Sequence, residues 1–239
     1  MFVAFGSTVL VPLLVGFDPA IALLAAGLGT LLFHAVTGGK VPIYLGSSFA
    51  FIAPIIKATE LYGLSGMFCG LVAVGLVYIL MSFLVKLFGV NFIKKLFPPI
   101  VIGPVIILIG LSLAGTGVDM ASKNWILALV SLFVAIICSC WGKGMIKLIP
   151  VVFGALAGYI VAVIFYRSSM DFSGVASAPW FQLPHFSKMS LSWQAIVFMA
   201  PVAIAPIIEH VGDVYAISEI AGKDFVKDPG LHRTMLGDG

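Results

Sequence analysis

Two acidic residues, Glu209 and Asp213, lie inside the apolar stretch MAPVAIAPIIEHVGDVYAI. They are four residues apart, so a helix would place both carboxyl groups on one face. Each carboxylate costs about 2.5 to 3.5 kcal/mol at the centre of a bilayer, so a partner or a function is expected. Glu209 could accept hydrogen bonds from N–H groups of a substrate, and desolvation beside a like charge favours protonation of one carboxyl group. We therefore predict a substrate ligand at Glu209 and a proton-coupling group at Asp213 or Glu209.

The alternative for these carboxylates is structural, either interhelical hydrogen bonds or one ion pair. The sequence offers no intramembrane Lys or Arg for the ion pair, which favours a function. His210 points roughly 100° away from the acidic face, and we interpret it as a hydrogen-bonded packing residue. The other acidic residues considered are assigned to loops or interfaces, namely Asp18, Glu60, Asp119, Asp171, Asp224, Asp228 and Asp238.

A second candidate for the site is the short apolar segment VPIYLGSSFAFIAPII between Lys40 and Lys57. As a continuous helix its residues would span about 24 Å, less than the roughly 30 Å of the hydrocarbon core. If about five residues near Pro42 are extended and the rest are helical, the length rises to about 33 Å. Pro42 disfavours helix before it, and Gly46 permits a turn. The segment is therefore predicted to be half extended and half helical.

We expect the switch to helix between Leu45 and Phe49, with Ser47 or Ser48 as the cap. Bare backbone at membrane depth is tolerated where it lines a cavity, and the half helix would point its N–H groups into that cavity. Phe49 could offer a flat face to a planar ligand. The alternative is that the small residues only allow close packing and that Phe49 faces lipid or the core.

The composition restricts which elements can position these residues. Of 239 residues, 61% are hydrophobic and 10% are charged, and the mean hydropathy is +1.17, which excludes a soluble domain and a disordered chain. A net charge of +3 does not indicate nucleic-acid binding. Cys69, Cys138 and Cys140 form neither a disulfide framework nor a metal motif, and no cofactor is expected. No catalytic motif is present, so an intramembrane enzyme is disfavoured.

Apolar runs bounded by charge or turn signals predict an all-α polytopic membrane protein with about eight transmembrane segments. No alternating ten-residue pattern of a membrane barrel is found. The predicted spans are 2–17, 19–37, 41–56, 62–85, 100–118, 125–141, 149–165 and 193–217.

Lysines and arginines then orient the chain, because cytoplasmic loops are enriched in them. The connections after even-numbered spans carry nine of these residues and the other loops carry four. We therefore expect a multi-pass protein of the cytoplasmic membrane with a cytoplasmic N-terminus. Both ends suggest an incomplete chain: Met1 leads directly into a short apolar run, and Leu236–Gly239 is interpreted as a polar connection.

Five further motifs are distinctive in combination, namely YLGSSFAFIAP (44–54), EHVGD (209–213), KDPGLHRTMLGDG (227–239), GSTVLVPLL (6–14) and KLFPPIVIGPV (95–105). Together they resemble the uracil permeases of the nucleobase cation symporter (nucleobase/ascorbate transporter) family, and the residues GSSFAF and DPGLHR suggest uracil. The resemblance implies two inverted repeats of seven segments, of which this chain covers the first and the opening helix of the second. It also implies a core domain at 1–95, a gate domain at 96–190, and a core segment with a cytoplasmic connection at 191–239.

By the same resemblance, Ser48, Phe49 and Glu209 bind the substrate, and Ser7 lines the site from the first segment. Uracil permeases of the best-known type carry histidine where this chain has Asp213. The inferred function is proton-coupled uptake of a nucleobase, most simply uracil, by alternating access. Expected partners are the nucleobase, a proton and the lipid bilayer, without nucleic acid. A homodimer is a further possibility. The alternatives are an anion transporter or channel of the same architecture, which Glu209 disfavours, and a non-transporting membrane subunit.

Overall fold

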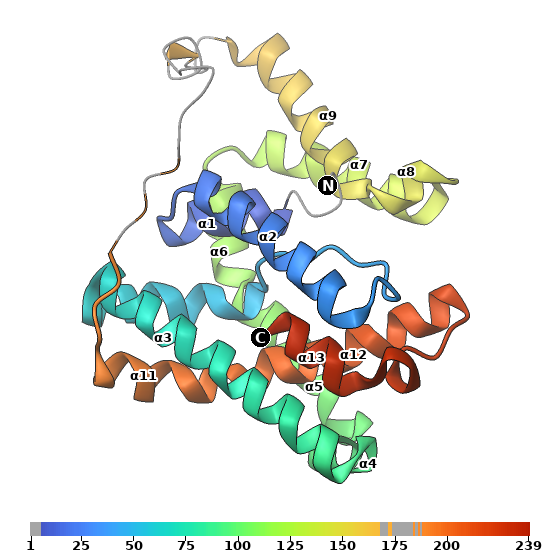
Figure 1. Ribbon diagram of the computed structural model, residues 1–239. Coiled ribbons are helices and arrows are strands. Elements are labelled where there is room, and N and C mark those ends of the chain that lie inside the picture. The colour runs from blue at the N-terminus through green and yellow to red at the C-terminus, as the bar shows by residue number, and fades with distance from the viewer. Residues whose placement is uncertain (1–5, 168–171, 174–183, 185, 187) are drawn as a thin grey trace. The chain divides into compact units, whose positions relative to one another are not determined.

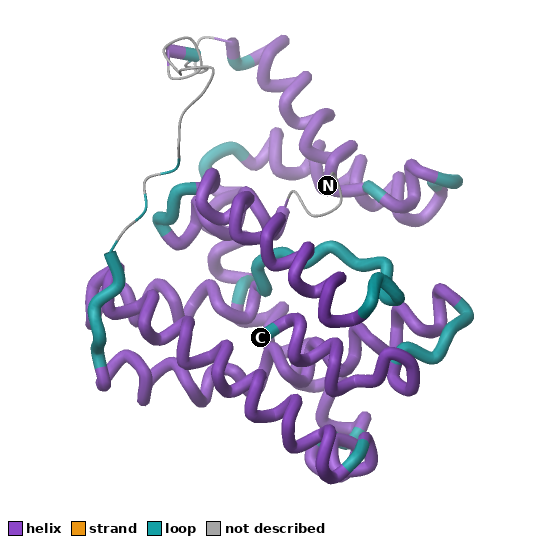
Figure 2. The backbone as a smooth tube through the Cα atoms, in the orientation of Figure 1, coloured by secondary structure: helices purple, strands orange, loops and turns teal. Residues whose placement is uncertain are grey.

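The computed structural model describes residues 6–167, 172–173, 184, 186 and 188–239. Within these residues the regular structure is helical and contains no strand (Figure 2). The chain forms two compact units (Figure 1), the larger made of Ser7–Ser112 with His185–Gly239 and the smaller centred on Leu113–Pro184. The larger unit holds all the predicted site residues. The boundaries of core and gate domains stay predictions.

The first helices of the larger unit are η1 (Gly6–Leu10), α1 (Val11–Val15) and α2 (Pro19–Thr37). Asp18 caps α2, because its carboxylate accepts a hydrogen bond of 2.9 Å from the N–H of Ala20. Pro19 takes the first helical position, where no N–H is needed, and Gly38 ends the helix with a φ of 66°. Helix α2 thus coincides with the predicted second span, whereas residues 2–5 of the predicted first span lie outside the described residues.

The third segment is broken as predicted. Residues 42–48 have no regular structure, and helix begins at η2 (Phe49–Phe51) and continues into α3 (Ile52–Phe88). Ser48 has extended backbone (φ −75°, ψ 136°), and its hydroxyl accepts a hydrogen bond of 3.2 Å from the N–H of Ala50. The predicted switch between Leu45 and Phe49 is confirmed.

Helix α3 joins the predicted third and fourth spans without a loop between them. Gly63 is the only break described inside it, with a φ of 68° and a ψ of 170° that residues with a side chain rarely adopt. The helix therefore turns at a single glycine and continues to Phe88. Two further helices of the larger unit follow, α4 (Val90–Leu96) and α5 (Pro99–Ser112).

The predicted eighth span consists of three consecutive pieces, α11 (Trp193–Met199), η4 (Ala200–Ala203) and α12 (Ile204–Ala221). Pro201 lies in the 3₁₀ turn η4, as expected for a residue that cannot donate a helical hydrogen bond. Gly222 ends α12 in the left-handed conformation (φ 63°). The 3₁₀ turn η4 interrupts the α-helix about two turns before Glu209.

Helix α3 packs against α11, η4 and α13 (Leu231–Asp238) to form the core of the larger unit. The backbones approach closely at Gly70, where a Cβ atom would lie 2.6 Å from Cγ of Met199. Met67 and Met199 have no exposed surface. Burial of a side chain of this kind stabilises a protein by about 1.5 to 3 kcal/mol relative to exposure to water. The gain is smaller relative to exposure to lipid.

The final segment differs from the expected polar connection. It forms η5 (Val226–Gly230) and α13 (Leu231–Asp238), and α13 lies among α2, α3 and α12 (Figure 1). Leu231, Thr234 and Met235 are completely buried. Because these residues recur at helical spacing with Asp238, they place one face of a largely polar helix toward the core.

The smaller unit contains α6 (Ala114–Ser122), α7 (Trp125–Trp141), α8 (Met145–Leu148) and α9 (Pro150–Phe165). Helices α7 and α9 match the predicted sixth and seventh spans and pack against each other. Gly154 allows their close approach, because a Cβ atom there would lie 2.6 Å from the carbonyl oxygen of Ser131. The predicted fifth span covers α5 and part of α6, with a break at Leu113.

Four helical stretches among the described residues are long and apolar enough to cross a membrane, namely Pro19–Thr37, Phe49–Phe88, Ile100–Ser122 and Trp193–Ala221. Trp125–Trp141 and Pro150–Phe165 are shorter apolar helices. Large apolar side chains such as Leu31, Ile107 and Phe165 are more than 60% exposed. An apolar surface of this extent fits lipid and not water. The protein is therefore an all-α polytopic membrane protein.

Candidate functional site

A cavity of about 780 Å³ in the larger unit brings the predicted site residues together. Its wall is built from η1 and α1, the extended residues 43–48, the middle of α3, α12 and the end of α13. Small-molecule sites occupy about 300 to 1,000 Å³, so the cavity has a suitable size. All five predicted residues line it, namely Ser7, Ser48, Phe49, Glu209 and Asp213.

Ser48 and Glu209 are joined by a hydrogen bond across the cavity wall. The Ser48 hydroxyl donates to Oε2 of Glu209 over 2.6 Å, and the Ser48 hydroxyl oxygen accepts a hydrogen bond from the N–H of Ala50. One hydroxyl thus caps the half helix and holds the carboxylate that faces it. Within the described part of the chain no other group donates to Glu209, so Oε1 can accept a hydrogen bond from a ligand.

Asp213 lies one helical turn beyond Glu209, on the same face of α12, and it also lines the cavity. It is the more exposed of the two carboxylates. Two carboxylates one helical turn apart repel each other when both are charged. Phe49 is 37% exposed in the structure and lines the same cavity. A planar ligand therefore finds an aromatic face and hydrogen-bond acceptors in one space.

The extended residues are fixed by contacts with α2 and η1. The N–H of Leu45 donates to the Thr30 hydroxyl over 3.0 Å, which gives a partner to a peptide group that no helix can satisfy. Gly46 lies close to η1, because a Cβ atom built on it would be 2.5 Å from Oγ of Ser7. A residue with a side chain at position 46 would therefore displace Ser7 from the cavity wall.

Two residues of the wall were not assigned to the site from the sequence. His210 is 7% exposed, and its Nδ1 lies 3.0 Å from Oδ2 of Asp238, while its Nε2 lies 3.1 Å from the Thr234 hydroxyl. The prediction that His210 is buried and hydrogen-bonded is confirmed. The assignment of Asp238 to a loop or interface is wrong, because α13 carries it into the cavity wall. The helical spacing of Leu231, Thr234 and Asp238 is the signal that could have shown this.

The charges around the cavity are all acidic apart from the His210 ring. Glu209, Asp213 and Asp238 line it, and no Lys or Arg is found among its described lining residues. No group of three or more His, Cys, Asp and Glu residues in the described ranges is arranged to hold a metal ion. The arrangement suits a ligand that donates hydrogen bonds and disfavours an anion.

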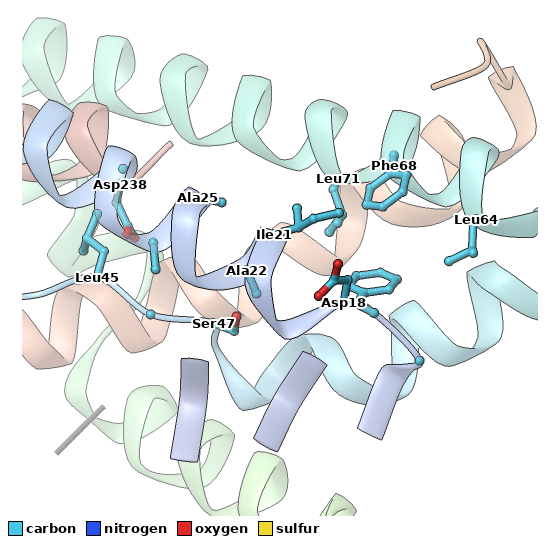
Figure 3. A pocket seen from close by; sticks show the side chains of 15 residues that line it. Asp18, Ile21, Ala22, Ala25, Leu45, Ser47, Leu64, Phe68, Leu71 and Asp238 are labelled. Carbon is cyan, nitrogen blue, oxygen red and sulfur yellow. The ribbon is translucent and has the colours of Figure 1, made fainter. Parts of the chain in front are cut away.

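A second cavity of about 400 Å³ adjoins the first and shares Phe17, Ala22, Ser47 and Asp238 with it, among others. It follows the small residues of α2, and Figure 3 shows Asp238 and Leu45 at one end of it and Asp18 and Phe68 at the other. The first cavity is lined by Glu209, and the second reaches the residues at the start of α2.

The sequence matches proteins of known family along its whole length. The model of the Permease family matches residues 1–239. A Haemophilus influenzae protein named "Probable uracil permease" is 48% identical over 248 residues, which cover 100% of this chain and 59% of that protein. The uracil permeases of Bacillus caldolyticus and Escherichia coli K12 are 44% and 38% identical, over 100% of this chain and 58% of each of those proteins.

The chain thus spans somewhat less than three fifths of the length of these curated relatives. The resemblance found in its motifs is confirmed by both kinds of match. With a family model that covers every residue, and with the broken third segment facing a carboxylate of α12 across one cavity, this chain belongs to the Permease family.

Proposed function

We propose that the protein takes up uracil across the cytoplasmic membrane by alternating access, together with a proton. The observation that carries the proposal is the Ser48–Glu209 hydrogen bond, which fixes an acceptor carboxylate at the start of a half helix beside Phe49. Uracil is planar and carries two N–H donors and two carbonyl acceptors. Its N–H edge can donate to Glu209, its ring can lie against Phe49, and its carbonyl groups can accept from backbone N–H groups of the broken segment.

The names of the curated relatives support the choice of substrate, because two of those cited are named "Uracil permease" and one "Probable uracil permease". The acidic wall supports a ligand that donates hydrogen bonds over an anion. We assign substrate binding to Glu209, Phe49, Ser48 and Ser7, and proton coupling to Asp213 with Glu209. Two adjacent carboxyl groups in one wall favour binding of a proton by one of them.

We further propose that the N-terminus faces the cytoplasm, from the distribution of Lys and Arg among the loops. In this orientation Asp18 lies on the outer side, and the second cavity provides a path from there to Glu209. The protein acts as a carrier and not as an enzyme, with residues 1–95 in the core domain and residues 96–190 in the gate domain.

The test uses the protein expressed from its complete coding sequence and reconstituted into liposomes. Labelled uracil should accumulate when the inside is made alkaline, and unlabelled uracil should compete. Uracils methylated on a ring nitrogen that donates to Glu209 should compete about ten- to a hundredfold less well, because one charge-assisted hydrogen bond is lost. Absence of saturable uracil uptake would refute the substrate, and uptake indifferent to the pH gradient would refute the coupling.

A further inference from the structure

His210 connects α12 with α13 through both of its ring nitrogens. Nδ1 contacts the Asp238 carboxylate at 3.0 Å, and Nε2 contacts the Thr234 hydroxyl at 3.1 Å. The Thr234 hydroxyl also lies 3.0 Å from the carbonyl oxygen of Leu231. His210 is buried, but it lines the cavity with Asp238, so water in the cavity can exchange protons with the pair.

The hydrogen-bonding groups of His210, Asp238 and Thr234 have partners in two protonation states of the His210 ring. With a neutral ring, Nδ1–H donates to Asp238, and Nε2 accepts from the Thr234 hydroxyl. With a charged ring, both N–H groups donate, and the Thr234 hydroxyl turns to the carbonyl of Leu231. Rotation of one hydroxyl group is therefore the only rearrangement that a gained or lost proton requires.

Among the described residues, the charged groups that interact with His210 are acidic. The basic residues of α13, His232 and Arg233, interact with each other, and His232 also interacts with Lys86. Glu209 and Asp213 come from its own helix, and α3 contributes the Tyr78 ring, whose centroid is 6.4 Å from that of His210. Helix α5, which packs against α12, contains no titratable residue. In η5 the charged side chains are paired elsewhere, Lys227 with Asp224 and Asp228 with Lys40.

We propose that the His210–Asp238 pair holds a proton that is transported with the substrate, with the Thr234 hydroxyl as the group that turns. This inference rests on the proton-coupled uptake proposed above and adds a proton-binding pair to its site. The proton binds Nε2 of the neutral ring from the cavity and leaves the same atom on release. When it is bound, an ion pair ties α12 to α13, one residue away from the substrate ligand Glu209. Binding or release of the proton therefore changes the strength of the contact between α12 and α13.

The experiment compares His210→Gln and Asp238→Asn with the parent protein, expressed from its complete coding sequence and reconstituted into liposomes. His34→Gln is the matched control, because His34 contacts Phe33 and is absent from the described lining of the cavity. Uracil counterflow needs no net proton movement, and all variants should retain it. The proton held by this pair contributes about a tenfold accumulation for each pH unit of gradient in the parent and the control. Both site variants should lose this accumulation.

Thr234 provides an independent comparison. Thr234→Ser keeps the hydroxyl and should behave as the parent does, whereas Thr234→Val removes it and should lose gradient-driven accumulation. If the parent accumulates uracil and His210→Gln and Asp238→Asn accumulate it equally well, the pair is not a coupling site. If the parent shows no gradient-driven accumulation, the proposed function itself fails. The two failures are therefore distinguishable.

A measurement on the parent protein covers the case in which a variant does not fold. Nitrogen NMR of labelled histidine, with the other three rings assigned by substitution, reports the protonation state of His210. Its signal should change from the neutral to the charged form as the pH falls, and uracil should shift the midpoint. A His210 signal that is constant between about pH 5 and 9, with and without uracil, would overturn the proposal.

Discussion

Replacement of Glu209 by Gln tests the substrate ligand most directly, because the structure determines which atom of the new side chain is left for the substrate. Ser48 donates to Oε2 of Glu209 over 2.6 Å. In the variant the single amide oxygen would accept this hydrogen bond, and the NH₂ group would take the place of Oε1. The ligand N–H would then face a donor instead of an acceptor.

The expected loss follows from the bond that is removed. A hydrogen bond to a charged group contributes about 1.5 to 3 kcal/mol, which corresponds to a loss of roughly ten- to a hundredfold in affinity for uracil. If the amide flips, it offers its oxygen to the ligand but leaves the Ser48 hydroxyl facing NH₂, so the loss persists at a different atom. The cavity volume is almost unchanged, since Gln and Glu have nearly the same shape.

Equilibrium binding of labelled uracil to the purified protein measures this loss. Glu60→Gln is the matched control, because Glu60 is an exposed residue whose carboxylate pairs with Lys57 at 3.0 Å. The control should bind uracil as the parent does. Equal Kd values for Glu209→Gln and the parent would refute the assignment of Glu209 as the substrate ligand.

Four further predictions follow from the same geometry. Asp213→Asn should spare uracil binding more than accumulation driven by a pH gradient, and equal losses in the two assays would contradict its proton-coupling role. Ser48→Ala removes both the helix cap and the donor to the carboxylate, so it should cost about 1 kcal/mol of stability and also weaken binding, whereas Ser48→Thr should restore both. Gly70→Ala should destabilise the protein by about 1 to 3 kcal/mol through contact with Met199, measured by denaturation in detergent; an unchanged transition would refute the close packing. Ala25→Phe should narrow the second cavity and slow uptake while leaving the Kd nearly unchanged, and an unchanged uptake rate would exclude that path.

The broken third segment and the shared cavity of Ser7, Ser48, Phe49, Glu209 and Asp213 could be predicted from the sequence. The break follows from local constraints, since a short span with Pro42 and Gly46 cannot cross the bilayer as a continuous helix. The roles of these residues in transport stay predictions. For Ser48, Phe49, Glu209 and Asp213 the common position required no side-chain detail, because half helices and buried carboxylates both avoid lipid and collect at the same interior surface. The position of Ser7 was implied by the family resemblance alone.

The parts that were missed depend on contacts between distant segments. Asp238 lies in a stretch of low hydropathy, so composition assigns it to a loop, and only the packing of α13 against α2 and α3 places it beside His210. The predicted third and fourth spans meet at Gly63, where non-helical backbone separates two helices with no longer loop between them. A glycine can end a helix or turn it, and the outcome depends on whether neighbouring helices hold the next turn in place.

The extended residues before Ser48 make the site depend on chain length as much as on side-chain chemistry. One residue inserted between Pro42 and Ser48 would advance the chain by about 3.3 Å and reverse which side chains face the cavity. Leu45 would then lose its alignment with Thr30, and Ser48 would move away from Glu209. Many substitutions in this stretch preserve the path of the peptide backbone, whereas a single insertion or deletion changes it. We therefore infer that descendants of this chain can vary residues such as Ile43 and Tyr44, but not the number of residues between Pro42 and Ser48.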